Sequence, residues 1–553
     1  MKTTGFAALA VLLLGAGVHA AEPVPELAER LSCKDEPVRY ALAAELTRAA
    51  SAGGGAVGEL AGALEKLFGD PSARIRTAAA IGIGNLGDAK LLPLLRKAAA
   101  TGDSSLLLAI TNARKALEDT RVADDLERML KGDAEPQGLA AARVMATAGD
   151  AEMLRRVVAA AQDRSAAVRT RAFFGLGFSR YRGTMDAIGL GLSDADAKAR
   201  QVAIDALGRR RARGEPIAQS VVMIMREDDS PAVRRAAANT LGLMLAQSAV
   251  EGLKLALQKD EDASVRVTAA TSLGSLRADA ARETLLETAR RDETVVRAAA
   301  LNALSRYRAK DLVREFVSLL KDPEARVRYA ALGCLAQFGK DDLGEAEKSF
   351  AMILTTDPDA RCRASAAFVL PKLGAREHFV LLVDAAGDPD PAVRTNAAAA
   401  LAKTQKRGER ADVRVADVLV KLLDDKAASV RGAAVQQCGR LGVKAAVEKA
   451  AALVRSDPDA TVRARAAKAL KSLGRTTTSV PALLDALGDS SGPVRAAAAA
   501  GLRSISGKRF GFGTYDAPSR RAKAIEAWKR WWQSQIAFPI GSRQGPRRGG
   551  PSA

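Results

Sequence analysis

The chain contains few of the residues on which most enzyme sites depend. Its 553 residues include two His, four Cys and three Trp, and aromatic side chains make up 4% of the total. Scarce His argues against a zinc enzyme or a His-based hydrolase, and scarce aromatics argue against a surface that stacks on single-stranded nucleic acid. No HExxH or GxSxG motif occurs. The composition therefore favours a binding protein with no catalytic residues and no cofactor.

Acidic residues are fewer than basic residues. Lys and Arg number 84 against 64 Asp and Glu, which gives a net charge of +20. The 48% apolar share excludes wholesale disorder, and 553 residues are too many for one ordinary core of roughly 100 to 200 residues. We therefore expect several domains or an array of repeats.

The one extended apolar run lies near the start of the chain. Lys2 precedes an uncharged stretch from Ala7 to Val18, and Val18-His19-Ala20 has the small residues that signal peptidase accepts. Twelve apolar residues are too few to cross a bilayer, which takes roughly 20. Residues 1–20 are therefore interpreted as a cleaved signal peptide, and the mature protein is expected in the periplasm or outside the cell, without a transmembrane segment.

The rest of the chain repeats an arginine at steps of mostly 31 to 37 residues. One larger gap, from Arg76 to Arg169, spans 93 residues and accommodates two degenerate units around Leu107 and Gly138. The sequence thus predicts about fifteen units. The repeated arginines are Arg39, Arg76, Arg169, Arg200, Arg234, Arg266, Arg297, Arg328, Arg363, Arg394, Arg431, Arg463 and Arg495.

Apolar residues recur at fixed offsets from each arginine. Val or Ile usually precedes it, Ala usually follows three positions later and Leu seven positions later, as at Val327, Ala331 and Leu335. These offsets are i, i+4 and i+8, which form one stripe along an α-helix. Each arginine therefore marks a helix with a buried stripe, in which Ala permits close approach of the neighbouring helix.

A turn precedes each of these helices. Asp commonly lies six residues before the Arg, often as Asp-Pro, which ends the preceding amphipathic helix, and a following Asp or Ser can cap the next one. Gly residues such as Gly274 and Gly474 are expected to stop the second helix. Each unit is therefore predicted to be helix, tight turn, helix.

Segments such as DPEARVRYAALGCLAQFG and DPDATVRARAAKALKSLG resemble HEAT repeats, specifically the short bacterial kind of the phycobilisome-lyase type. The resemblance covers roughly residues 22 to 502 and implies an all-α fold, an α-solenoid whose helix pairs stack into a superhelix with a concave binding face. It also implies that turn Asp and Arg residues form a structural ladder between units. The ladder residues are Asp194, Arg200, Asp228, Arg234, Asp260, Arg266, Asp322, Arg328, Asp357, Arg363, Asp388, Arg394, Asp457, Arg463, Asp489 and Arg495.

The remaining chemistry-bearing residues form no recognisable set. Cys362 and Cys438 occupy apolar positions of the repeat and are expected to be buried. Cys334 and Cys362 lie in adjacent units, and the sequence does not decide whether they form a disulfide. His378 is expected to be a surface residue beside a turn. The paired acids of the Asp-Pro-Asp turns lack the ordered ligand spacing of a calcium loop, and no metal site is predicted.

The end of the chain differs from the repeats. Residues 503–536 contain all three tryptophans, Trp528, Trp531 and Trp532, at spacings that place them toward one side of a helix. The repeats are predicted to end at residue 502, and this segment is predicted to cap them. The alternative is that the tryptophans form an aromatic interaction patch. Residues 537–553 are predicted to be a basic flexible tail, and 503–553 carry a net charge of +9, which favours contact with anionic lipid or polymer.

Three hypotheses of function follow. The first is a non-enzymatic protein-protein interaction scaffold in an exported compartment, whose partner the sequence does not identify. The second is binding of nucleic acid or another polyanion through basic surfaces, which the signal peptide and the scarce aromatics oppose. The third is an enzyme related to phycobilisome lyase subunits, for which the resemblance transfers no catalytic residue because it covers the repeat alone.

Overall fold

The computed structural model describes residues 30–52, 57–211, 215–343, 346–374, 378–405, 411–474 and 476–537. These residues form 32 α-helices and ten short 3₁₀ segments, without a strand among them. The expected signal peptide and most of the expected tail lie outside the described residues. The all-α prediction is confirmed for the part of the chain that the structure describes.

The chain divides into two compact units. The first contains residues 42–374 and the second contains 375–553 together with 22–41, so that α3 (Glu36–Ser51) begins in the second unit and ends in the first. The domain boundaries at 502 and 536 stay predictions.

The first unit consists of helix pairs, with each second helix carrying the repeated sequence positions. Its helices are α4 (Val57–Phe68), α5 (Ala73–Leu86), α6 (Leu92–Ala98), α7 (Ser104–Ala116), α8 (Val122–Lys131), α9 (Glu135–Thr147), α10 (Ala151–Ala160), α11 (Ala166–Leu176), α12 (Met185–Leu190), α13 (Ala197–Arg209), α14 (Glu215–Glu227), α15 (Pro231–Met244), α16 (Val250–Lys259), α17 (Ala263–Leu276), α18 (Arg282–Arg291), α19 (Thr294–Leu304), α20 (Val313–Ser318), α21 (Ala325–Leu335), α22 (Lys340–Leu343), α23 (Ala346–Thr356), α24 (Ala360–Val369) and α25 (Pro371–Gly374).

The second unit continues the same arrangement and ends on a longer helix. Its helices are α26 (Phe379–Ala385), α27 (Pro391–Lys403), α28 (Val413–Lys421), α29 (Ala428–Leu441), α30 (Val447–Ser456), α31 (Ala460–Leu473), α32 (Ser479–Ala486), α33 (Gly492–Ser506) and α34 (Pro518–Ala537). The two degenerate units predicted around Leu107 and Gly138 correspond to α6 with α7 and α8 with α9.

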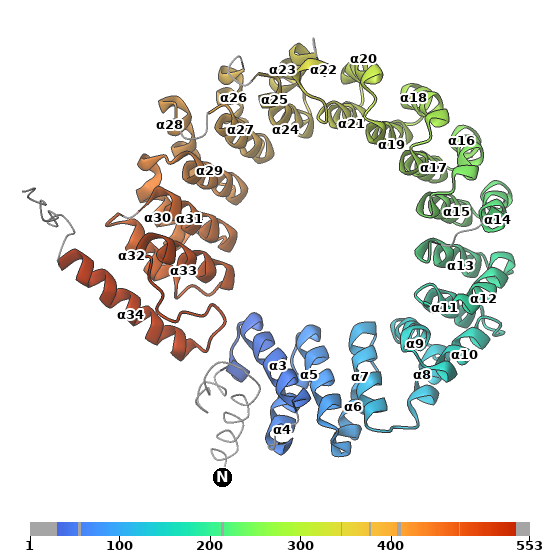
Figure 1. The fold of residues 1–553 in the computed structure, drawn as a ribbon. Helices are drawn as coiled ribbons and strands as arrows, with labels where there is room; N and C mark the ends of the chain where they lie inside the picture. Colours follow the sequence, from blue (N-terminus) through green and yellow to red (C-terminus); the bar gives the residue numbers. More distant parts are fainter. Residues whose placement is uncertain are drawn as a thin grey trace, which may run out of the picture. The chain divides into compact units, whose positions relative to one another are not determined.

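The helices form two layers. Within the first unit, α13, α15, α17, α19 and α21 pack side by side, and each also packs on the first helix of its own pair, such as α14 on α15 or α16 on α17 (Figure 1). The second helices lie on the inside of the bend of this unit (Figure 1). This is the layered arrangement of an α-solenoid.

The predicted stripe forms the core between the layers. In α21, Val327, Ala331 and Leu335 are each fully buried. Burial of such side chains in every pair supplies the hydrophobic stabilisation that a short helix pair could not provide alone. The small Ala in the middle of the stripe allows neighbouring second helices to approach closely.

Acidic caps begin several of the second helices. The side chains of Asp262, Asp359, Asp390 and Asp459 accept backbone N–H groups in the first turns of α17, α24, α27 and α31. The serines in the equivalent place, such as Ser230 and Ser491, do not form a side-chain cap bond. Capping therefore depends on the turns that carry a second Asp.

The prediction that Gly274 ends its helix is wrong. Gly474 follows α31 with a φ of 97°, as a helix stop requires, whereas α17 continues through Gly274 to Leu276. A Cβ at Gly274 would lie 2.7 Å from the Cα of Ala303. The glycine therefore allows α17 and α19 to touch at the backbone, and does not end the helix.

Candidate interaction surfaces

The repeated arginines join each helix pair to the next. In the first unit, Arg328 donates from Nε and Nη2 to the carboxylate of Asp357 at 2.8 Å each, and from Nη1 to the carbonyls of Asp322 and Pro323 at 2.9 and 2.8 Å. One guanidinium thus binds both the turn before its own helix and the carboxylate of the following helix pair. We call this series of contacts the arginine ladder, and its ion pairs within the first unit are Arg169–Asp194, Arg200–Asp228, Arg234–Asp260, Arg266–Asp292, Arg297–Asp322 and Arg328–Asp357.

The ladder continues in the second unit with the same geometry. Its ion pairs there are Arg394–Asp425, Arg431–Asp457 and Arg463–Asp489. Arg495 has no later repeat to contact, and it forms an ion pair with Asp35, which precedes α3 and belongs to the same unit. Arg363 donates to the carbonyl of Asp357 at 2.9 Å, and Asp388 accepts the N–H of Asp390 at 2.8 Å.

Two carboxylates of the ladder, those of Asp194 and Asp425, are held in their charged form. Two hydrogen bonds from the guanidinium of Arg169, each 2.7 Å long, lower the pKa of Asp194 below its usual value. The guanidinium of Arg394 lowers the pKa of Asp425 in the same way. Since each acid also accepts a backbone N–H two residues later, as Asp194 does from Asp196, the turn and the ion pair stabilise each other.

Two regions depart from the regular pattern. Arg266 pairs with Asp292, which lies one residue later than the repeat alignment places the acid of this unit. Next to the degenerate pairs, Arg171 of α11 reaches back to the pair of α8 and α9, where it donates to Glu135 at 2.8 Å and to the carbonyl of Leu130 at 2.9 Å. A search for any Asp within one residue of the expected place would have found Asp292.

The cysteines are free thiols. Cys334 and Cys362 are buried and do not form a disulfide, because the Sγ of Cys334 contacts the carbonyl of Leu301 at 3.1 Å and that of Cys362 contacts the carbonyl of Ala325 at 3.5 Å. Burial raises the pKa of Cys334 and of Cys438 to about 12. These thiols therefore fill apolar positions of the repeat and are poor nucleophiles.

His378 differs from its predicted environment. It is 9% exposed and immediately precedes α26, which packs on α27. It is therefore buried where a surface residue was expected. Within the described residues, no group of three or more His, Cys, Asp or Glu side chains could hold a metal ion.

The inner layer of the first unit presents a group of arginines and aromatic rings that repeat consensus positions do not include. The rings of Phe174 and Phe178 meet edge to face with centroids 5.2 Å apart. The guanidinium of Arg143 lies 4.5 Å from the Phe178 centroid, and that of Arg209 lies 5.3 and 5.2 Å from Phe174 and Phe178. We call these four residues the Arg–Phe cluster.

The cluster spans the three helix pairs that contain α9, α11 and α13, and it adjoins a hollow that reaches α7 of the preceding pair. The hollow has a volume of about 460 Å³ and is bordered by Ser104 and Ser105 of α7, Arg143 and Thr147 of α9, Phe178, Arg180 and Tyr181. Tyr181 is 44% exposed, and no Asp or Glu lines the hollow. Burial lowers the pKa of Arg209, but the arginine remains cationic at neutral pH. The surface is therefore basic and partly aromatic.

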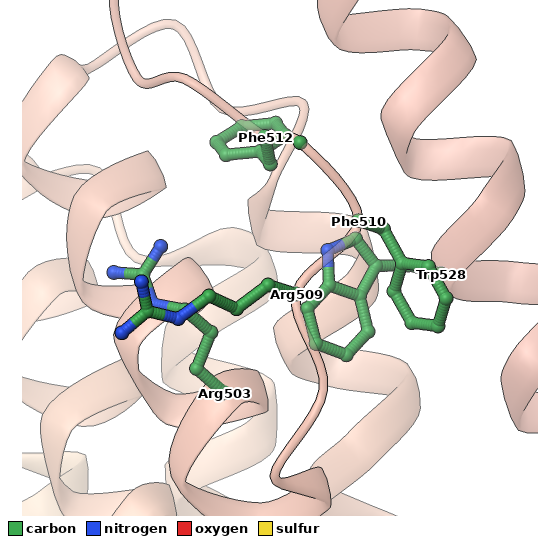
Figure 2. Close-up of a pocket in the computed structure, with 6 residues that line it drawn as sticks. Arg503, Arg509, Phe510, Phe512 and Trp528 are labelled. Carbon is green, nitrogen blue, oxygen red and sulfur yellow. The ribbon is translucent and has the colours of Figure 1, made fainter.

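The three tryptophans lie on α34 at the end of the second unit. Trp528 and Trp532 are 1% and 9% exposed, and Trp528 contacts Phe510 and Trp531 edge to face at centroid distances of 4.7 and 5.6 Å. The helix packs against α32. Trp528 also lines a pocket with Arg503, Arg509, Phe510, Gly511 and Phe512 (Figure 2). The tryptophans therefore form both an end contact and one wall of a cavity.

A search of the described helices found none with the length and hydropathy needed to span a bilayer.

Comparisons with known proteins concern the repeat. A family model described as HEAT repeats matches residues 60–146, 218–305, 283–346, 347–434 and 416–503. No curated protein matches the chain.

Solved structures share the fold at low identity. A Kap95:Nup1 complex is similar with 14% identity and a TM-score of 0.54, and Kap95p with RanGDP with 15% identity and a TM-score of 0.53; both matches cover 98% of this chain and 80% of that chain. The complex of CpcE and CpcF of phycocyanin lyase from Nostoc sp. PCC7120 is 22% identical over 43% of this chain and 94% of that chain, with a TM-score of 0.27. Because the family model matches more than half of the residues and the helix pairs carry its repeat, the chain belongs to the HEAT-repeat proteins.

Proposed function

We propose that this protein is a non-enzymatic scaffold that binds a protein partner through the Arg–Phe cluster. The observation that supports this proposal most directly is the cluster itself, because Arg and aromatic residues dominate the binding energy of protein interfaces. Its rings and guanidiniums lie on the inner layer, outside the buried stripe and the arginine ladder. Kap95, whose fold is similar, forms complexes with Nup1 and with RanGDP.

The expected partner carries acidic residues. Arg143 and Arg209 lie over the faces of the phenylalanine rings, and Arg180 borders the adjoining hollow, which has no acidic side chain in its wall. An acidic segment that places a carboxylate beside these arginines and an apolar side chain in the 460 Å³ hollow would match both charge and size. Guanidiniums over aromatic rings are already oriented, so little side-chain entropy is lost on binding.

The partner test compares two double variants of the full chain as baits. Arg143→Gln with Phe178→Ala removes part of the cluster, whereas Met223→Ala with Leu190→Ala removes exposed apolar side chains elsewhere, on α14 and α12, which are 56% and 54% exposed. We expect a protein recovered with the wild type to be lost with the first variant and retained with the control. Equal recovery with both, at equal thermal stability, would contradict the proposal.

We also propose that the protein works in the periplasm or outside the cell. The proposal rests on the apolar run from Ala7 to Val18 and the small residues that end at Ala20. The measurement is the N-terminal sequence of the protein purified from cell fractions of its source. A mature chain that starts at Ala21 in the exported fraction is expected, and a chain retaining Lys2 in the cytosol would contradict the proposal.

A further inference from the structure

The pocket at the end of the second unit combines cationic and aromatic walls. It has a volume of about 360 Å³, which is within the range of small-molecule sites. Arg503 projects from α33, while Arg509, Phe510, Gly511 and Phe512 belong to the segment between α33 and α34. The remaining wall is Trp528 of α34, so the pocket is built by three consecutive pieces of one compact unit.

The two arginines form an unbalanced pair of positive charges. Both arginines line the pocket, and Figure 2 shows their guanidinium groups toward the same end of it. Within the described chain neither has an ion pair or a hydrogen bond, and no acidic residue lines the pocket. Most of the thirteen repeated arginines, by contrast, are paired in the arginine ladder. Two neighbouring guanidiniums without a counter-charge repel each other and attract an anion.

A third donor lies in the opposite wall. Trp528 is 1% exposed, yet its Nε1–H has no hydrogen-bond partner. Buried donors are nearly always satisfied, so an exception in the wall of a cavity points to a ligand or water at that place. Figure 2 shows the indole beside Arg509, with its ring nitrogen at the edge that lies toward Phe512.

The aromatic walls define the rest of the ligand. Phe510 meets Trp528 edge to face at a centroid distance of 4.7 Å, which fixes both rings, and Phe512 lies across the pocket from them (Figure 2). Rigid rings at these positions offer flat apolar surfaces to a ring of the ligand. Charge at one end and rings at the other favour a compound that is anionic at one end only.

We infer that this pocket binds a small phosphate monoester whose phosphate is attached to a flat ring. A phosphate monoester carries nearly two negative charges at neutral pH, which matches the two guanidiniums, and Arg forms paired hydrogen bonds with phosphate oxygens. The ring lies against Phe510 and Phe512, while the unpaired indole N–H of Trp528 donates to an oxygen of the ligand. This binding site is independent of the Arg–Phe cluster of the first unit.

The test uses phenyl phosphate as the probe and the full-length protein. Tryptophan fluorescence and calorimetry at pH 7.5 are expected to show saturable binding to a single site. Arg503→Gln with Arg509→Gln should weaken it by at least about tenfold, since each charged hydrogen bond contributes that much. The matched control, Lys471→Gln with Lys508→Gln, removes the same charge from two exposed positions of this unit that do not line the pocket.

Further arms identify which part of the ligand is recognised. Benzyl alcohol, which lacks the phosphate, should not bind, and inorganic phosphate, which lacks the ring, should bind more weakly than phenyl phosphate. Binding should also weaken at pH 5, where the phosphate monoester carries a single charge. These outcomes together support the assignment.

Several outcomes would overturn it. They are no saturable binding to the wild type, equal affinity in the arginine variant, equal loss in the lysine control, or binding of benzyl alcohol as tight as that of phenyl phosphate. Equal affinity for inorganic phosphate would remove the role of the aromatic walls. Because Arg503 and Arg509 are exposed, both variants are expected to melt at the wild-type temperature, and that melt is measured first.

Discussion

Replacing Arg328 by Gln tests whether the arginine ladder holds helix pairs together. The Arg328 side chain is 10% exposed and that of Asp357 is 4% exposed, so the pair is nearly sealed from water. The substitution removes two hydrogen bonds to the carboxylate and two to the carbonyls of Asp322 and Pro323. It also leaves the charge of Asp357 buried without a cationic partner, with the N–H of Asp359 at 2.8 Å as its remaining hydrogen-bond donor.

The expected cost is about 3 to 5 kcal/mol, the range found when one member of a buried ion pair is removed. Four lost bonds at about 1.5 to 3 kcal/mol each would exceed this value, but such contributions are not additive. The double variant Arg328→Gln with Asp357→Asn should recover part of the loss, because no unpaired charge then remains. Coupling of about 1 to 3 kcal/mol is expected between the two positions.

A neighbouring ion pair supplies the control. Arg361 pairs with Asp359 at 2.8 Å on the surface, where its side chain is 64% exposed and water screens the pair, so Arg361→Gln should cost far less than Arg328→Gln. The assay is hydrogen exchange of the amides in α21 and α24, combined with urea denaturation, since repeat arrays can open locally. A cost for Arg328→Gln no larger than that for Arg361→Gln would refute the reasoning.

Three other predictions concern packing and acid stability. Leu335→Ala should destabilise by about 2 to 5 kcal/mol in urea denaturation, because the side chain is fully buried; a near-neutral melt would mean that the stripe is not the core. Gly274→Ala should destabilise the protein, because the new Cβ would lie 2.7 Å from the Cα of Ala303. Gly333→Ala on α21 should instead stabilise it by about 0.5 to 1 kcal/mol, since nothing lies within 4 Å of the new Cβ. Thermal melts that rank the two variants the other way would contradict this prediction. Folding lowers the pKa of Asp194, so the stability that its carboxylate contributes is present above the ordinary pKa near 4 and is lost as the pH falls through the folded-state value. Asp194→Asn should therefore flatten the loss of stability between about pH 5 and pH 2. An unchanged pH profile would argue against the Arg169–Asp194 pair.

The repeat could be predicted because it is local. Val327, Ala331 and Leu335 lie within nine residues, and their spacing alone identifies the buried face of α21. The same spacing recurs along the chain, so that even the degenerate pairs could be placed by counting. The solenoid and its family were therefore predictable from sequence.

The Arg–Phe cluster was not predicted, because it depends on residues from different repeats, whereas Trp528 of the pocket in the second unit belongs to the aromatic patch that the sequence offered as an alternative to a cap. Arg143, Phe174, Phe178 and Arg209 lie five or nine positions after the repeat arginines or their equivalents, on the side of each helix that consensus positions leave free. Reading those two offsets across neighbouring repeats would have brought the four together. The pairing of Arg495 with Asp35 has no such signal, since 460 residues separate them in sequence.

The arginine ladder also affects how such a chain can change in length. Each helix pair carries one guanidinium for the pair that follows and one carboxylate for the pair before it. If one whole pair were excised, for example residues 229–260, Arg200 and Asp228 would remain together and Arg266 would follow at the usual distance of six residues. Duplication of a pair would likewise add one cation and one anion that complete each other. The number of repeats can therefore vary in evolution or in engineering without leaving a buried charge unmatched.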